Sequence, residues 1–220
     1  MREIQEDLLT LGSMVDKAID RAITALQTQN ESLAEQVVHG DEAINDKRWQ
    51  IEESTLHLIA TQSPMAGDLR RILASVHIAT NLERMGDHAE GISKLTLRTS
   101  DNAPLKPLVD LPLMAEKGRA MLHDALEAFV DGDADRARDI AARDQEIDHL
   151  YQQVYNDLLT FMIADPGTTT RATHLLWVAH NLERIGDRST NICERIIFAV
   201  TGRFEEVNPK DFSNALFDAN

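Results

Sequence analysis

Apolar residues recur at intervals of three and four along most of the chain. In residues 3–29 the series includes Leu8, Leu11, Val15 and Ile19, and charged residues fill the remaining positions. This spacing is typical of an amphipathic helix. No segment shows the sustained two-residue alternation, rich in β-branched side chains, that predicts a strand. The pattern therefore predicts an all-α protein.

The apolar pattern is interrupted five times, which divides the chain into six long helices. The predicted helices cover residues 3–29, 30–61, 64–98, 111–130, 134–164 and 169–200.

Residues at the interruptions favour particular helix ends. Asn30 is a candidate N-cap of the second helix, and Asp133 is one for the fifth. Ser63 followed by Pro64 suggests an N-cap and a first helical position for the third helix. Gly202 is the expected C-cap of the last helix.

Three long helices on each side of a linker predict two tandem, elongated, antiparallel three-helix bundles. Pro104 and Pro107 mark the linker. The predicted units are listed in chain order as follows: a first bundle over residues 1–100, a linker over 101–110, a second bundle over 111–202, and a C-terminal tail over 203–220.

A heptapeptide occurs twice. Residues 81–87 read Asn-Leu-Glu-Arg-Met-Gly-Asp, and residues 181–187 differ only by Ile in place of Met. Such an echo at about half the chain length indicates two copies of one structural unit, related by a pseudo-two-fold repeat. Each copy carries Glu and Asp four positions apart, so both carboxylates project from one face of a helix.

A second acidic segment lies on the middle helix of each repeat. Counted from Pro64, Asp41 lies 23 residues back and Asp87 lies 23 residues forward. At equal rise per residue these positions come level on neighbouring antiparallel helices. The same reasoning applies around Pro166. It predicts a first cluster of Asp41, Asn45, Glu83 and Asp87, and a second cluster of Asp144, Asp148, Glu183 and Asp187.

Several carboxylates at one level require a cation, protons or arginine partners. Oxygen-rich clusters bind Mg²⁺, Ca²⁺ or Mn²⁺, and carboxylate-bridged clusters also hold iron or zinc. Gly86 and Gly186 stand inside the helices at the same level, which suggests close helix approach or room for a ligand. Inter-helix salt bridges through Arg84 and Arg184 are the alternative explanation.

The direction in which the clusters face stays open at this stage. On an ideal helix Glu83 and Asp87 continue an apolar stripe that includes Ile72 and Val76, as in a groove between helices. The same helix has a second apolar side, which is made of Leu82, Met85, Ala89 and Ile92.

Composition restricts the function. The formal net charge is −15 and the pI is near 4.8, which disfavours direct binding of nucleic acid or of an anionic membrane. The charge suits cations or a basic partner, although it can also serve solubility alone. Cys193 is the only cysteine, and we find neither a signal-peptide core nor a membrane span. We therefore expect a cytoplasmic protein.

No catalytic arrangement stands out. Glu146 and His149 form one Glu-x-x-His motif, whereas the di-iron sites of ferritin-like bundles need two. There is no Ser-His-Asp order and no glycine-rich phosphate loop. We predict that the protein is not an enzyme. Trp49 and Trp177 are interpreted as packing or interface residues.

The tandem units, the repeated heptapeptide and the stretch Ser-Pro-Met-Ala-Gly-Asp-Leu-Arg-Arg-Ile at residues 63–72 resemble the PhoU family of phosphate-uptake regulators. The resemblance covers residues 1–202. It implies a non-enzymatic adaptor that represses phosphate-starvation signalling. Such proteins connect the phosphate ABC transporter, through its ATPase subunit, to a membrane sensor histidine kinase, which would recruit the protein to the inner face of the membrane.

The resemblance also implies metal ions, in some members as iron or zinc clusters; manganese and magnesium are further candidates. Asn45 departs from the acidic pattern, so the first cluster should bind fewer ions or bind them more weakly. We expect a homodimer. A carboxylate-bridged metalloprotein for storage or redox chemistry and a metal-free structural adaptor remain alternatives. The implied ligands are Asp41, Glu83, Asp87, Asp144, Asp148, Glu183 and Asp187.

Overall fold

The computed structural model of the chain describes residues 2–99, 105 and 108–207. Within these ranges helices dominate and no strand occurs, which confirms the predicted all-α class. The elements in chain order are α1 (Arg2–Thr28), α2 (Glu31–Gln62), α3 (Ala66–Thr99), α4 (Asp110–Asp131), α5 (Ala134–Ala142), α6 (Asp144–Ala164), the short 3-10 helix η1 (Pro166–Thr168) and α7 (Thr169–Thr201).

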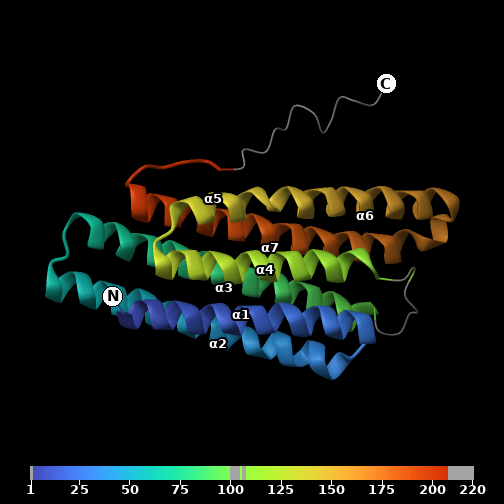
Figure 1. Cartoon of the computed structure of the whole chain (residues 1–220). Helices are drawn as coiled ribbons and strands as arrows, with labels where there is room; N and C mark the ends of the chain where they lie inside the picture. The colour runs from blue at the N-terminus through green and yellow to red at the C-terminus, as the bar shows by residue number, and fades with distance from the viewer. Residues whose placement is uncertain (1, 100–104, 106–107, 208–220) are drawn as a thin grey trace.

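The helices form two bundles that lie side by side (Figure 1). The first consists of α1, α2 and α3, and the second of α4, α5, α6 and α7. The bundles meet along α3 and α7, which make the most extensive contact between any two helices, and along α1 and α4. Four helices therefore run as neighbours in the order α2, α3, α7, α6. Helix α1 packs on the first pair and α4 on the second.

Helices α3 and α7 run antiparallel. Near the start of α3, Arg70 lies against Gly202 at the end of α7, where an added Cβ would lie 3.5 Å from Arg70 Cζ. Further along α3, a Cβ on Gly91 would lie 3.3 Å from Asn181 Oδ1. This register places the two copies of the heptapeptide next to one another, near the middle of both helices. The repeats are thus related by an approximate two-fold axis that passes between them.

Most of the predicted caps are confirmed. The Asn30 side chain accepts a hydrogen bond from the N–H of Leu33 at 3.0 Å, and Asp133 accepts one from the N–H of Arg136 at 2.9 Å. Gly202 ends α7 in the left-handed conformation with φ of 74°. Each cap satisfies backbone groups that the helix itself cannot pair.

The prediction for the start of the third helix is wrong. Ser63 is the C-cap of α2 rather than an N-cap: its φ is 45° and its N–H donates to the carbonyl of Ile59. That bond completes the last turn of α2. Pro64 therefore lies in the connection, outside any helix, and α3 begins at Ala66.

The fifth predicted helix is present as α5 and α6, which follow one line in Figure 1 and are separated by Arg143 alone. The N–H of Arg143 bonds to the carbonyl of Ile140 three residues back, so the turn is tighter there than in an α-helix. This break comes directly before Asp144, which is buried.

Much of the predicted linker and most of the predicted tail lie outside the described residues. The described part of the tail packs on the second bundle. Phe204 stacks on Phe198 with ring centroids 4.2 Å apart, and Arg138 of α5 pairs with Glu205 at 2.9 Å. None of the described helices combines the length and the apolar character that crossing a membrane requires.

Candidate metal centre

The structure settles which side of α3 faces the core. Leu82, Met85, Ala89 and Ile92 are all fully buried. Glu83 and Asp87 belong to the same helix but lie on its flank toward α2, where Asp41 approaches. The acidic residues therefore lie along the groove between α2 and α3 and do not line the core.

Asp41 of α2 lies close to three carboxylates of α3. Its pKa is raised to about 6, first because the side chain is half-buried, and then because Asp87, Glu90 and Glu83 repel its charge. Asn45 opposes this shift, since its amide donates to Asp41 Oδ2 at 2.9 Å. The structure thus brings together the first cluster that the spacing predicted.

The repeated glycines let the aspartates of α2 and α6 approach the third helix of each repeat. A Cβ on Gly86 would lie 3.4 Å from Asp41 Oδ1. A Cβ on Gly186 would lie 2.5 Å from Asp144 Oδ1 and 2.9 Å from Ile147 Cδ1. Both aspartates are therefore level with the repeated stretch, and the approach is closer in the second repeat.

The second cluster is more buried than the first. Asp144 is 1% exposed and Glu183 is 9% exposed. Arg184 pairs with Asp187 at 3.2 Å and lies 3.7 Å from Glu183. Asp148 follows one turn after Asp144 on α6 and is half-buried. The cluster therefore combines buried carboxylates with one partly exposed arginine.

The carboxylates suit a hard or borderline cation. Asp41 Oδ1 is buried and accepts no hydrogen bond, although a buried ionised oxygen normally has a partner. In the described part of the chain, however, neither predicted set has three ligand atoms within 4.8 Å of one another. Arg48 lies 3.8 Å from Glu83 in the first cluster.

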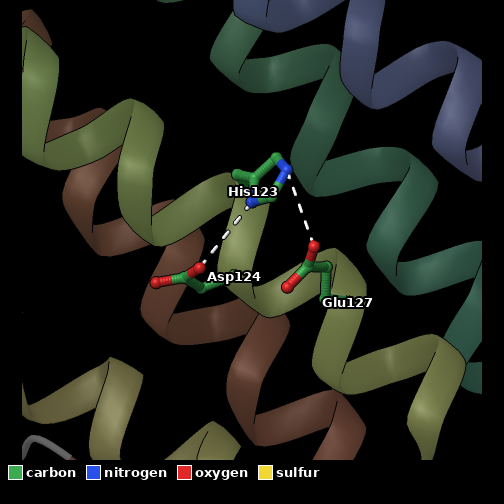
Figure 2. Close-up of side chains that lie close together, drawn as sticks. All are labelled: His123, Asp124 and Glu127. Carbon is green, nitrogen blue, oxygen red and sulfur yellow. Dashed lines mark ion pairs between the residues drawn. The ribbon is translucent and has the colours of Figure 1, made fainter.

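Among the described residues, one other group does have three potential ligand atoms within 4.8 Å of one another, and it is drawn in Figure 2. His123 lies 3.7 Å from both Asp124 and Glu127 on α4. Both carboxylates already have strong partners: Arg143 bonds to Asp124 at 2.6 Å, and Arg136 bonds to Glu127 at 2.5 Å. The pKa of Asp124 is lowered despite its burial, because Arg143 binds its charged form. We interpret this group as a surface ion-pair network.

Sequence reasoning missed several neighbours of the first cluster. Glu90 was not assigned to it, although it lies three residues after Asp87 and so shares its helix face. Arg48 binds Glu52 at 2.5 Å as well as approaching Glu83, and its guanidinium stacks over Trp49. No sequence motif marks Arg48, because its role depends on the packing of α2 on α3.

A strip of basic and polar residues separates the two clusters where α3 and α7 lie side by side. We call it the central seam and define it by Arg84, His88, Asn181, Arg184 and Arg188. Burial, followed by repulsion from Arg84 and Arg184, lowers the pKa of Arg188, and the nearby Asp187 and Asp87 oppose that shift. His88 bonds to Asn181 at 3.0 Å across the two repeats, and burial lowers its pKa, so it is neutral at pH 7.

Comparison with known proteins gives one consistent result. The family model described as the PhoU domain matches the chain twice, over residues 8–96 and 111–196. A protein of Clostridium acetobutylicum described as a phosphate-specific transport system accessory protein PhoU homolog is 38% identical and covers 94% of this chain and 95% of its own length. An Aquifex aeolicus protein with the same description is 37% identical, with coverages of 84% and 83%.

Solved structures agree with this result. The crystal structure of PhoU from Pseudomonas aeruginosa superimposes with a TM-score of 0.87 at 31% identity, and covers 92% of this chain and 97% of that one. The structure of the phosphate transport system regulatory protein PhoU from Streptococcus pneumoniae gives a TM-score of 0.86 at 31% identity, with coverages of 93% and 96%.

The two repeated glycines provide a matched pair of substitutions. Gly186→Ala should lower the free energy of unfolding by about 1–2 kcal/mol, because overpacking against Asp144 and Ile147 outweighs the better helix propensity of alanine. Gly86→Ala should be nearly neutral, because its nearest contacts are 3.2 Å away. Urea unfolding measures both. Equal stability of the two variants would contradict the tighter packing of the second cluster.

Asp41 gives a pH-dependent prediction for the metal-free protein. Its pKa is about 6 in the folded state, above its ordinary value of 3.8, so its contribution to stability is greatest below about pH 4 and is lost as the pH rises through 6. The shift corresponds to about 3 kcal/mol, which solvent screening reduces to about 1 kcal/mol.

Asp41→Asn should therefore stabilise the metal-free protein at pH 8 and have little effect at pH 4. Urea unfolding in the presence of a chelator measures the difference at each pH. Glu42→Gln, which removes an exposed charge from the next position of α2, is the control. Stabilisation by Asp41→Asn of equal size at both pH values would show that the charge of Asp41 is not the cause.

Proposed function

The chain belongs to the PhoU family, and on this premise we propose that it is a regulatory accessory protein of a phosphate-specific transport system, whose two carboxylate clusters bind metal ions. The observation that carries the proposal occurs in both repeats. In each, an aspartate of the middle helix lies against the glycine of the repeated heptapeptide, Gly86 in the first repeat and Gly186 in the second. Its role is repression of phosphate uptake and of starvation signalling. The names of its relatives support the link to phosphate transport.

The residues of each cluster have distinct tasks. Asp41 and Asp144 approach from the neighbouring helix, while the repeated stretch provides Glu and Asp four positions apart. Asp148, one turn after Asp144 on α6, is the further ligand that we propose for the second cluster. A bound cation would neutralise these carboxylates and hold the two helices of each groove at a fixed spacing. Iron, zinc, manganese and magnesium all accept such oxygen ligands.

The regulation works through contacts with proteins. The partners we propose are the ATPase subunit of the phosphate transporter and a sensor histidine kinase, which the protein meets in the cytoplasm as a homodimer. Helices α2 and α7 each carry an exposed aromatic side chain, which supports a role in contacts with partner proteins. Trp49 of α2 is 56% exposed and Trp177 of α7 is 57% exposed, although large aromatic residues are usually more buried.

A metal-free adaptor is the main alternative. The pairs between Arg184 and Asp187 and between Arg48 and Glu83 favour it, because they partly balance the acidic charge without any ion. Asp41 Oδ1 favours the metal, because no arginine or amide satisfies it. A storage or redox metalloprotein has less support, since the one complete His-containing group among the described residues is bound by arginines.

Metal analysis tests the metal-binding part of the proposal. The protein purified without chelators should contain metal in stoichiometric amount, and Glu183→Ala/Asp187→Ala should lose the share bound by the second cluster. Removing a metal present at 100 times its dissociation constant should lower the free energy of unfolding by about 3 kcal/mol. Glu31→Ala/Glu35→Ala removes an exposed acid pair with the same spacing and should keep all the metal. Metal-free wild-type protein under reducing conditions would refute metal binding.

Co-purification tests the regulatory part separately. The tagged full-length chain should retain the transporter ATPase subunit, and Trp49→Ala or Trp177→Ala on the exposed surface should weaken that complex at least tenfold if the aromatic residue is an anchor. Leu9→Ala, on the exposed side of α1, is the control. A protein that captures neither the ATPase subunit nor a sensor kinase would leave the regulatory role without support.

A further inference from the structure

Five large apolar side chains are exposed around the connection between α2 and α3. We call them the hairpin patch and define it by Leu56 and Ile59 of α2, Met65 of the connection, and Leu69 and Leu73 of α3. Met65 is 79% exposed and Leu56 is 68% exposed. Single exposed apolar residues are ordinary on a protein surface, whereas a contiguous group of them marks a site of interaction.

The members of the hairpin patch lie at matching heights on the two helices. Ile59 comes three residues before the last residue of α2, and Leu69 comes three residues after the first residue of α3. Leu56 and Leu73 are six and seven residues from the same two helix ends. Because an α-helix rises equally per residue, each pair is nearly level on these antiparallel neighbours. The patch is therefore one continuous surface.

The end of the α2–α3 hairpin extends past the second bundle (Figure 1). Helix α7 ends at Gly202, which lies against Arg70 near the start of α3. Helix α1 packs against the buried sides of α2 and α3. Neither helix covers the patch, which is therefore accessible to a partner.

The sequence around the patch is poor in acidic residues. Acidic residues occupy 37 of the 220 positions of the chain, yet Asp68 is the only one between Glu53 and Glu83. The same stretch contains Arg70 and Arg71. The patch is thus an apolar surface with a basic border, on a chain whose net charge is −15. Charge complementarity favours an acidic partner at this place.

Two helix ends hold these arginines beside the patch. A Cβ on Gly202, the C-cap of α7, would lie 3.5 Å from Arg70 Cζ, and a Cβ on Gly132, the C-cap of α4, would lie 3.2 Å from Arg71 Nη2. The C-terminus of a helix carries only about half a negative elementary charge. Within the described ranges, neither arginine has a carboxylate within 4.0 Å. Each arginine therefore keeps part of its charge for a partner that binds next to it.

We propose that the hairpin patch binds an amphipathic helix of a partner protein, whose apolar stripe is bordered by aspartate or glutamate. Such a helix places apolar residues at intervals of three and four against an apolar surface, and its acidic border meets Arg70 and Arg71. Trp49, two turns before Leu56 on α2, extends the same surface. The inference rests on the proposed function for the existence of a regulatory partner, and it adds the surface and the chemistry of the contact.

A membrane fits this surface less well than a protein helix. Asp87 follows Leu69 by 18 residues, which is five full turns, so both lie on the same side of α3. A flat bilayer resting on the patch would therefore meet the first carboxylate cluster. Insertion of the hairpin end would place Thr61, Gln62 and Ser63 in the lipid, although these residues are polar.

Fluorescence anisotropy with two designed helical peptides tests the chemistry of the partner. Both peptides have about 18 residues, or five turns, and the same leucine stripe, which one borders with glutamate and the other with lysine. The full-length chain should bind the glutamate peptide saturably and about tenfold or more tightly than the lysine peptide. The net charge of −15 alone predicts the opposite order. Tighter binding of the lysine peptide would therefore overturn the proposal.

Matched substitutions locate the binding site. Leu69→Glu and Leu73→Glu should each lower the affinity for the glutamate peptide about tenfold or more, the loss typical of an anchor residue. Leu159→Glu on α6 adds the same charge at a similarly exposed leucine (42%, against 44% for Leu69) and should leave the affinity unchanged. Arg70→Gln/Arg71→Gln should remove the preference for the glutamate peptide. Unchanged affinity in both patch leucine variants would show that the peptide binds elsewhere and would overturn the proposal.

Sedimentation with lipid vesicles tests the membrane as the occupant. Vesicles of phosphatidylethanolamine and phosphatidylglycerol should not carry the full-length chain into the pellet. Sedimentation that Leu69→Glu abolishes would assign the patch to the membrane and overturn the proposal.

The peptide assay gives its answer independently of the proposed function. If the tagged chain retains the transporter ATPase subunit but does not bind the glutamate peptide, the regulatory role stands and this inference fails. If the chain binds the glutamate peptide at the patch but retains neither the ATPase subunit nor a sensor kinase, the inference stands and the proposed regulatory partners are wrong.

Discussion

The packing of α3 against α7 is the contact on which the rest of the structure depends. It joins the two bundles more extensively than any other pair of helices, and it places the repeated stretches side by side near the middle of the molecule. Because the two helices are antiparallel, the flank of each that meets its own neighbour, α2 or α6, carries an acidic cluster. The central seam lies between the clusters, where α3 and α7 face each other, and it holds the arginines. One helix contact thereby determines where negative and positive charge gather.

Local chemistry made much of the fold predictable. Asn30, Asp133 and Gly202 act as caps where their side chains or conformational freedom indicated, and counting residues on each side of a proline turn was enough to bring Asp41 level with Gly86. Ser63 shows the limit of such reasoning. A serine before proline is compatible with the end of one helix as well as with the start of the next, and the choice depends on whether its N–H completes the preceding turn.

The parts of the site that could not be predicted depend on contacts between distant segments. Spacing identified the aspartates and glutamates, yet it could not show that Arg48 would reach Glu83 from α2, or that Arg188 of the second repeat would come within electrostatic range of Asp87 of the first. It also left two apolar sides of α3 as equal candidates for the core. Long side chains that act across a helix interface leave no local periodicity, so their partners become known only when the packing is known.

The approximate two-fold axis has a further consequence at positions 88 and 188. In a dimer of identical chains, a residue near the axis has the same residue opposite it, so both sides must carry the same chemistry. Here both halves belong to one chain, and equivalent positions hold His88 and Arg188. A covalently joined pair of repeats can therefore have a polarity that no symmetric dimer can have, with a neutral hydrogen-bonding side and a permanently charged side. The molecule has two similar halves but a single orientation, which gives any partner that docks across the axis one way to bind.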